Sequence, residues 1–129
     1  MADKMILVET SVLIDYYRKT DKEKSVWINL VRQGYSFSIS AVTKYEIYAG
    51  ATPNQLSFWD NVLQAINVLP LDEVSVDTAV MINSSLKKKR KQIALADLFI
   101  AATAVAYHFS LATLNRKHFD RIDTLNLVD

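Results

Sequence analysis

The stretch YSFSISAVTKYEIYA, residues 35–49, contains one strand followed directly by one helix. Tyr35, Phe37 and Ile39 alternate strictly with serines, which is the period of a strand with one apolar face. The rest of the stretch changes to the period of a helix, for which Ser40 is a suitable N-cap. A strand that leads straight into a helix is typical of α/β proteins.

The same alternation of strands and helices extends in both directions along the chain. We expect further strands at residues 5–8, 66–69, 111–114 and 125–128, and further helices at residues 12–19, 22–33, 53–64, 73–91 and 96–108. No two strands are joined by a tight hairpin, so the sequence predicts a central parallel sheet of about five strands with helices on both faces. In the longest helix, the predicted buried stripe consists of Val76, Ala79, Val80 and Leu86.

The composition restricts the class of protein. A chain of 129 residues fits one domain, 1–129. Two Gly and two Pro are too few for an all-β sandwich, and the lack of Cys excludes disulfide scaffolds, thiol catalysis and cysteine zinc sites. The N-terminus shows no signal-peptide pattern, and the most apolar segment, residues 93–107, is too short to span a membrane. We therefore expect a cytoplasmic protein with no membrane partner.

Several polar residues are expected where strands end or where the apolar helix begins. They are Glu9, Thr10 and Ser11 after the first strand, Glu46 after the second, Asp97 at the start of the apolar helix and Asn115 after the fourth strand. In parallel α/β sheets, ligands bind outside the carboxyl ends of the strands. These residues can therefore converge on one site.

Each of these side chains also has an ordinary structural interpretation. Asp97 is the only Asp, Glu, Lys or Arg within residues 93–107, where it is either a helix N-cap or a ligand. Glu9, at the end of a buried strand, is equally open to both interpretations. Taken singly, Glu46 is typical of an exposed glutamate on a short helix, and Asn115 of a loop cap.

Other polar residues are interpreted as structural. Asp15, Asp72 and Glu73 are expected to be solvated or to cap helices. His108 and His118 lack the spacing of a zinc site and are expected to be ordinary surface or core histidines.

Taken together, Glu9, Glu46, Asp97 and Asn115 supply only oxygen ligands. Such a set selects Mg²⁺ or Mn²⁺, and a divalent ion also relieves the repulsion between neighbouring carboxylates. In phosphodiester hydrolysis, the ion polarises a phosphoryl oxygen and activates water.

A run of five basic residues lies near the end of the long predicted helix: Lys87, Lys88, Lys89, Arg90 and Lys91. The whole chain has a formal charge of +1, so the remaining residues together carry −4. The run is either a solvated helix end, which the helix dipole favours, or a patch that binds the phosphates of RNA. A nuclear-localisation signal is a weaker interpretation.

Four segments contain the candidate site residues: LVETSVLID (residues 7–15), SISAVTKYEIYAG (38–50), ALADLFIAATAVA (94–106) and LATLNRKHFDRI (111–122). Each segment alone is weakly specific, but four in this order and spacing are specific. With them the chain resembles the PIN-domain ribonucleases, and in particular the VapC-type toxins of bacterial toxin–antitoxin pairs.

The resemblance implies an endoribonuclease that depends on Mg²⁺ or Mn²⁺ and cuts structured RNA, such as transfer or ribosomal RNA. It implies a PIN-like fold, a frequent homodimer, and a cognate antitoxin that blocks the site with a peptide segment. Glu9, Glu46 and Asp97 would hold the ion and Asn115 would support it. Thr10 and Ser11 would orient the acids or the phosphate.

The chain departs from the family pattern at two positions. Glu9 stands where the family has Asp, and its extra methylene moves the carboxylate by roughly 1 Å. Glu9 is either natural or an introduced attenuating change, and the site is either an attenuated ribonuclease or a weakened module that only binds RNA or antitoxin. Arg90 stands where the family usually has Gly. A receiver-like phosphotransfer domain is disfavoured, because Pro70 and Leu71 follow the third predicted strand in place of an acceptor Asp.

Overall fold

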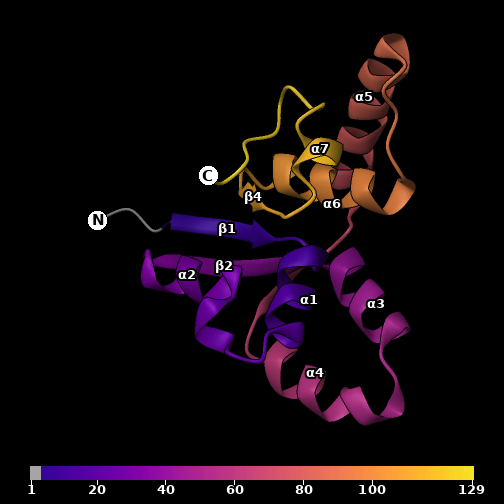
Figure 1. Cartoon of the computed structure of the whole chain (residues 1–129). Helices are drawn as coiled ribbons and strands as arrows, with labels where there is room; N and C mark the ends of the chain where they lie inside the picture. Colours follow the sequence, from indigo (N-terminus) through magenta and orange to yellow (C-terminus); the bar gives the residue numbers. More distant parts are fainter. Residues whose placement is uncertain (1–3) are drawn as a thin grey trace.

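Four parallel strands form the central sheet of the computed structural model, which describes residues 4–129 (Figure 1). The strands are β1 (Lys4–Val8), β2 (Tyr35–Ser40), β3 (Asn67–Leu69) and β4 (Ser110–Ala112), in the order β3-β2-β1-β4. Residues 1–3, which belong to the N-terminal segment without a predicted signal peptide, lie outside the described residues. The predicted parallel sheet is confirmed, with one strand fewer than expected.

The fifth predicted strand, residues 125–128, is wrong. Leu127 forms only an isolated parallel bridge to Leu111. The Leu111 N–H donates to Asn126 O at 2.8 Å, and the Val128 N–H donates to Leu111 O at 2.9 Å. The pairing of the C-terminal segment with β4 is therefore limited to one position, Leu111.

Helices and short 3-10 turns connect the strands. They are α1 (Thr10–Arg18), η1 (Lys22–Lys24), α2 (Val26–Arg32), α3 (Ala41–Gly50), η2 (Pro53–Gln55), α4 (Leu56–Leu63), α5 (Glu73–Lys89), α6 (Leu95–Ala106) and α7 (Arg116–Phe119). The expected N-cap of α3 is confirmed, since Ser40 Oγ accepts from the Thr43 N–H at 2.9 Å.

Two helix predictions are wrong in detail. Residues 22–33 do not form one helix, because the N-cap Ser25 separates η1 from α2. In α5, Val76 and Val80 are 41% and 65% exposed. The buried residues of α5 are instead Ser75, Ala79, Ile82 and Leu86, because this face of the helix packs against α6.

Successive residues of β1 face opposite sides of the sheet and belong to two different cores. Leu7 packs in the core formed with α5, α6 and the segment after β4. Ile6 and Val8 pack in the core formed with α1, α2, α3 and α4. The prediction of helices on both faces of the sheet is therefore confirmed.

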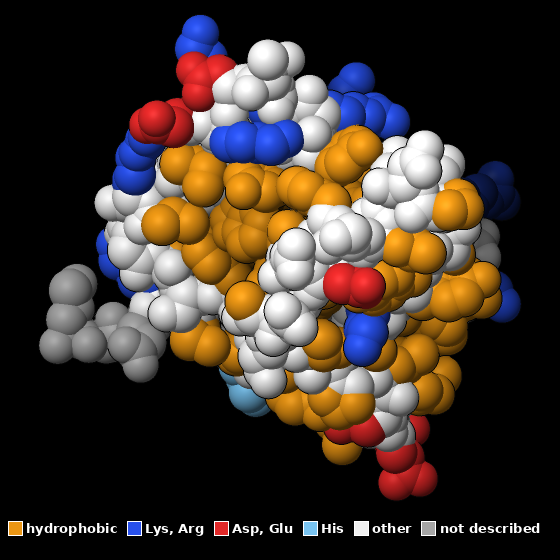
Figure 2. Space-filling view, turned by 90° about the horizontal axis from the view of Figure 1, so that it is seen from below, with side chains coloured by type: hydrophobic (Ala, Val, Ile, Leu, Met, Phe, Trp, Pro, Cys, Tyr) orange, Lys and Arg blue, Asp and Glu red, His pale blue; other side chains and the backbone are white. Residues whose placement is uncertain are grey.

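Aromatic side chains pack α1 against α2 and α4. The ring centroids of Tyr16 and Trp27 lie 4.8 Å apart, and those of Tyr17 and Phe58 lie 5.0 Å apart. Figure 2, which views the molecule from the side of α4, shows hydrophobic side chains gathered over much of this face. This packing fixes the direction of α1 and therefore the position of its first turn, which follows Glu9.

Within residues 4–129, no helix combines the length and the apolar character that crossing a bilayer requires.

The topology places a switch point between β1 and β4. From β1 the chain moves to β2 and β3 on one side of the sheet, then returns to form β4 on the other side of β1 (Figure 1). Val8 and Ala112, the last residues of the two strands, are paired. Clefts at such points, outside the carboxyl ends of the strands, are the usual ligand sites of open α/β sheets.

Candidate active site

Glu9 lies at this switch point, where it is the N-cap of α1 and only 3% exposed. Its Oε1 accepts hydrogen bonds from the hydroxyls of Ser11 at 2.6 Å and Thr113 at 2.5 Å. Its Oε2 accepts from the Ser11 N–H at 3.2 Å. The buried carboxylate is thus stabilised by three donors, as burial of a charge requires.

The two hydroxyls that hold Glu9 are themselves held by the backbone that follows β4. The Leu114 N–H donates to Ser11 Oγ at 2.9 Å, and the Asn115 N–H donates to Thr113 Oγ1 at 2.9 Å. Each hydroxyl therefore accepts from the backbone and directs its own hydrogen at Glu9. This network ties the start of α1 to the end of β4.

Glu46 reaches the same region from α3. Its Oε1 accepts from the hydroxyl of Thr10, the first residue of α1, at 2.6 Å. The Thr10 hydroxyl also lies 3.2 Å from Thr43 Oγ1, on the preceding turn of α3. Adjacent residues of α1, Thr10 and Ser11, therefore contact two different carboxylates.

Asp97 lies in the first turn of α6, but it is not the N-cap of that helix. The N-cap is Ala94, which makes no side-chain capping bond, so the capping interpretation of Asp97 is wrong. Instead, Asp97 Oδ2 lies 3.2 Å from Nδ1 of His118, on α7. A side chain distant in sequence therefore replaces the helix backbone as the partner of this carboxylate.

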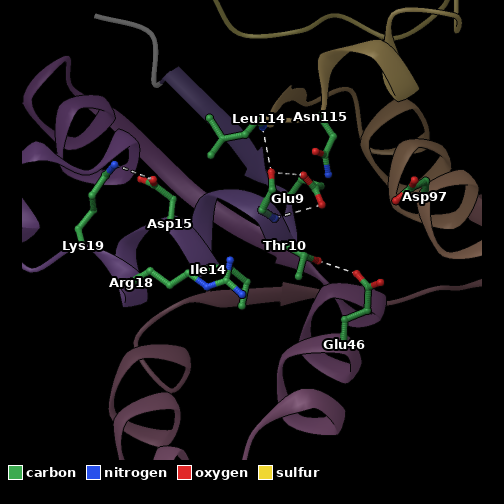
Figure 3. Close-up of a pocket in the computed structure, with 11 residues that line it drawn as sticks. Glu9, Thr10, Ile14, Asp15, Arg18, Lys19, Glu46, Asp97, Leu114 and Asn115 are labelled. Atoms are coloured by element: carbon green, nitrogen blue, oxygen red, sulfur yellow. Dashed lines mark hydrogen bonds and ion pairs between the residues drawn. The ribbon is translucent and has the colours of Figure 1, made fainter.

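One open pocket of about 620 Å³ brings these side chains together (Figure 3). Its lining consists of Glu9, Thr10, Ser11, Ile14, Asp15, Arg18, Lys19, Glu46, Asp97, Leu114 and Asn115. All six polar residues singled out in the sequence as a converging set line this pocket.

The donors in the pocket fit a hard divalent cation, because the carboxylates and the Asn115 amide offer oxygen ligands. Among residues 4–129, no three Asp, Glu, His or Cys side chains lie close enough together to surround one ion. Hydrogen bonds hold the carboxylates of Glu9, Glu46 and Asp97 on separate partners, an arrangement that limits their mutual repulsion. The candidate ligands therefore line one pocket without three of them meeting at a single point.

Two basic residues in the pocket were not anticipated from the sequence. Arg18 and Lys19 follow at the end of α1, one helical turn beyond Ile14 and Asp15. Lys19 pairs with Asp15 at 3.3 Å, and Asp15 Oδ2 also accepts from the Val26 N–H at 3.0 Å. Asp15 thus binds the first N–H of α2, whose N-cap is Ser25. The spacing of Arg18 on the face of Ile14 was the signal available in the sequence.

Thr113 and His118 were also missed, although both lie in the segment 111–122. Thr113 directly follows β4, the same position that drew attention to Glu9 after β1. For His118, the sequence offers only its proximity to Asn115, since nothing local pairs it with Asp97.

The basic run is remote from this pocket. Residues 87–91 are exposed and lie at the end of α5 that points away from the sheet, and none of them lines the pocket (Figure 1). Lys89 Nζ lies 2.7 Å from Asp123 Oδ2, and this ammonium group holds the pKa of Asp123 below its usual value. Arg90 has φ 56° and ψ 41°, the left-handed conformation for which glycine is best suited.

The family model described as "PIN domain" matches residues 6–125. The chain is also 32% identical over 126 residues to ribonuclease VapC1 of Methanocaldococcus jannaschii, covering 97% of this chain and 86% of that protein. The chain belongs to the PIN-domain family, among the VapC ribonucleases. It is likewise 32% identical over 122 residues to ribonuclease VapC10 of Mycobacterium tuberculosis, covering 94% of this chain and 90% of that protein.

The fold is also similar to that of a chain in a solved structure described as "Toxin-antitoxin complex from Klebsiella pneumoniae". The two chains are 25% identical in sequence and superpose with a TM-score of 0.75. The match covers 93% of this chain and 94% of the other. The PIN-domain match contains all four candidate ligands, from Glu9 to Asn115. All the residues that line the pocket therefore lie within the part of the chain that matches the family.

Proposed function

We propose that this VapC chain is an endoribonuclease toxin that depends on Mg²⁺ or Mn²⁺ and is neutralised by a cognate antitoxin. The observation that supports it most directly is the pocket at the switch point, where Glu9, Glu46, Asp97 and Asn115 lie together. Their oxygens suit a hard cation, and the relatives of this chain are named ribonucleases.

Glu9, Glu46 and Asp97 would hold the ion, and Asn115 would support it or its waters. A bound Mg²⁺ or Mn²⁺ supplies Lewis-acid stabilisation of the charge that develops on a phosphodiester during hydrolysis. Thr10 and Ser11 orient two of the carboxylates through their hydroxyls. These residues therefore form the proposed catalytic set.

The substrate proposed is structured RNA, such as transfer or ribosomal RNA, acted on in the cytoplasm. Arg18 and Lys19 line the pocket and offer cationic groups beside its carboxylates. Farther away, Lys87, Lys88, Lys89, Arg90 and Lys91 would contact phosphates of the same RNA at a distance from the cut. The exposed position of this run at the end of α5 is compatible with that role.

The proposed protein partners are an antitoxin and a second copy of the chain. The antitoxin proposal is supported by similarity to a chain from a complex whose printed description is "Toxin-antitoxin complex". The homodimer rests on the resemblance to VapC toxins. Sedimentation of the chain alone, and after co-expression with the adjacent reading frame, tests both partners.

Glu9 supports a second candidate function, a PIN-fold module that binds RNA or antitoxin without efficient cleavage. The Glu9 carboxylate is buried and accepts three hydrogen bonds within the protein, which hold it in its present orientation. If this orientation persists, the carboxylate is a weaker metal ligand than a free one.

One experiment separates the two functions. The melting temperature and the cleavage of total RNA are measured with and without Mn²⁺, for the natural chain, Asp97→Asn, and the control Asp77→Asn on the exposed face of α5. The ribonuclease proposal expects Mn²⁺ to raise the melting temperature and to permit cleavage, with both effects lost only in Asp97→Asn. Mapping the RNA ends then identifies the cleavage site.

Binding of RNA without Mn²⁺-dependent cleavage supports the weakened module. A melting temperature that Mn²⁺ raises equally in Asp97→Asn and in the natural chain excludes Asp97 from the metal site.

A further inference from the structure

Each of the three candidate metal-binding carboxylates in the pocket is held by a donor, but the donors differ in origin. Glu9 and Glu46 accept from hydroxyls of adjacent residues in the first turn of α1. Asp97 has its contact with the imidazole of His118, which is 21 positions away in sequence and belongs to α7. Asp97 is 17% exposed and His118 is 53% exposed, so the contact lies at the rim of the pocket.

We propose that His118 is a positioning residue for the metal site, which holds the carboxylate of Asp97 through its Nδ1–H. The inference rests on the proposed function, because it assigns to Asp97 the role of a metal ligand. Hydrogen bonds to ligating carboxylates orient them, and loss of such a partner typically weakens metal affinity by about 10- to 100-fold.

The contact determines which nitrogen of His118 carries hydrogen. An ionised carboxylate only accepts hydrogen bonds, so the nitrogen that faces Asp97 Oδ2 at 3.2 Å has to donate. In the neutral imidazole, this requires the Nδ1–H tautomer and leaves Nε2 as an acceptor. The proposal therefore predicts the Nδ1–H tautomer of His118, which can be measured without any metal.

The fold keeps His118 in place through its neighbour in sequence. Phe119 is fully buried in the core shared with α6, and the His118 N–H donates to Asn115 O at 3.0 Å. The short helix α7 thus directly follows one pocket residue, Asn115, and places His118 against another, Asp97.

Substitutions at position 118 can show whether the side chain acts by donating a hydrogen bond or only by filling space. The amide nitrogen of Asn is separated from Cα by as many bonds as Nδ1 of His, whereas the amide nitrogen of Gln is one bond farther. We therefore compare His118→Ala, His118→Asn and His118→Gln. The control is His108→Asn, since His108 is the other histidine, lies outside this pocket, and has φ 61°, which Asn tolerates.

The first measurement is the dissociation constant for Mn²⁺ alone, by calorimetry without RNA. We expect His118→Ala to weaken binding by about 10- to 100-fold, His118→Asn to restore most of the affinity, and His118→Gln to restore little. His108→Asn should bind as the natural chain does. Equal Mn²⁺ affinity of His118→Ala and the natural chain overturns the positioning role while leaving the proposed function intact.

The second measurement uses the natural chain without metal. Nitrogen NMR of the imidazole, at a pH about two units above the ordinary pKa of histidine, should show the Nδ1–H tautomer for His118. In Asp97→Ala this preference should disappear. A dominant Nε2–H tautomer in the natural chain overturns the proposal, and so does a natural chain that binds no Mn²⁺, which in addition contradicts the proposed function.

Discussion

The hydroxyl of Thr113 lies 2.5 Å from Oε1 of Glu9 and donates a hydrogen bond to it. Thr113 follows β4 and Glu9 follows β1, so this bond joins the carboxyl ends of the two strands at the switch point. The Glu9 side chain, one methylene longer than the aspartate that the resemblance implies at this position, is thereby held by hydrogen bonds within the protein.

Removal of the Thr113 hydroxyl should destabilise the fold. Thr113→Val leaves the buried Glu9 carboxylate with one donor fewer, and a hydrogen bond to a charged group contributes about 1.5–3 kcal/mol. We expect the free energy of unfolding, measured in urea, to fall by about this amount. Thr113→Ser keeps the hydroxyl and should stay closer to the natural chain; a loss in Thr113→Ser without a loss in Thr113→Val would show that the methyl group and not the hydrogen bond matters.

Glu9→Asp tests the attenuation hypothesis. If the longer acid holds the ion about 1 Å from its best position, the shorter one should raise Mn²⁺-dependent cleavage by up to roughly a hundredfold. Single-turnover cleavage of RNA and toxicity in cells provide the measurement. Glu46→Ala in the Glu9→Asp chain should remove the gain, whereas equal cleavage by the chain with Glu9 and the Glu9→Asp variant would end the attenuation hypothesis.

The Asp72–Tyr107 bond should make stability depend on pH. The Tyr107 hydroxyl donates to Asp72 Oδ2 at 2.5 Å, linking the N-cap of α5 to the C-cap of α6. This bond, with smaller contributions from Ser75, lowers the pKa of Asp72 below 3.8, and the same bond raises the pKa of Tyr107 above 10.0. Its stabilisation is therefore present between these values and is lost as each group titrates in the folded protein.

Tyr107→Phe should accordingly lower the melting temperature most near neutral pH. The difference from the natural chain should shrink as the pH falls below 3.8 and as it rises above 10.0. Tyr45→Phe, at a hydroxyl that is largely exposed, is the matched control and should show no such profile. A constant difference at every pH would attribute the effect to packing.

Arg90→Gly should stabilise the chain. Arg90 has φ 56°, and the following residue closes the helix end through the Lys91 N–H, which donates to Leu86 O at 2.9 Å. A left-handed conformation costs a residue with a Cβ roughly 1–2 kcal/mol, so glycine should raise the melting temperature by several degrees. Lys88→Gly, within the helix, should instead lower the melting temperature. If Arg90→Gly and Lys88→Gly both lower it, the left-handed conformation of Arg90 is not a source of strain.

Neutralisation of Lys87 and Lys88 should weaken RNA binding irrespective of sequence. If the run contacts phosphates, replacing both by Gln should make the slope of log affinity against log salt shallower by about 1–2. The control is the double variant Lys4→Gln with Lys24→Gln, which changes the net charge by the same amount. Lys4 is the first residue of β1, at the end of the strand opposite the pocket. An unchanged slope in the Lys87 and Lys88 variant would identify the run as a solvated helix end.

Local patterns in the sequence predicted most elements of this fold correctly. The alternation in residues 35–40 predicted β2 with its observed bounds, and Ser40 predicted the start of α3. The absence of hairpins predicted a parallel sheet, which in turn predicted that Glu9, Glu46, Asp97 and Asn115 could meet. These features depend on neighbours along the chain, so the sequence alone was enough.

Most of the errors concern contacts between elements, whereas the separation of η1 from α2 at the N-cap Ser25 is a local feature. The buried face of α5 is the one that meets α6, and residues 125–128 find only the short edge of β4, which no local pattern reveals. In the sequence, His118 has the pattern of an ordinary surface histidine, and only the position of α7 in the fold shows that it contacts Asp97.

The sequence by itself thus determined the order of strands and helices and the acids at their ends, because periodicity and capping are local. Only the tertiary structure decided which donor each acid receives. Thr113 meets Glu9, and His118 meets Asp97, across 104 and 21 positions of sequence. Such pairs form where β4 lies beside β1 and α7 lies beside α6, and that placement follows from the burial of two cores on opposite faces of the sheet.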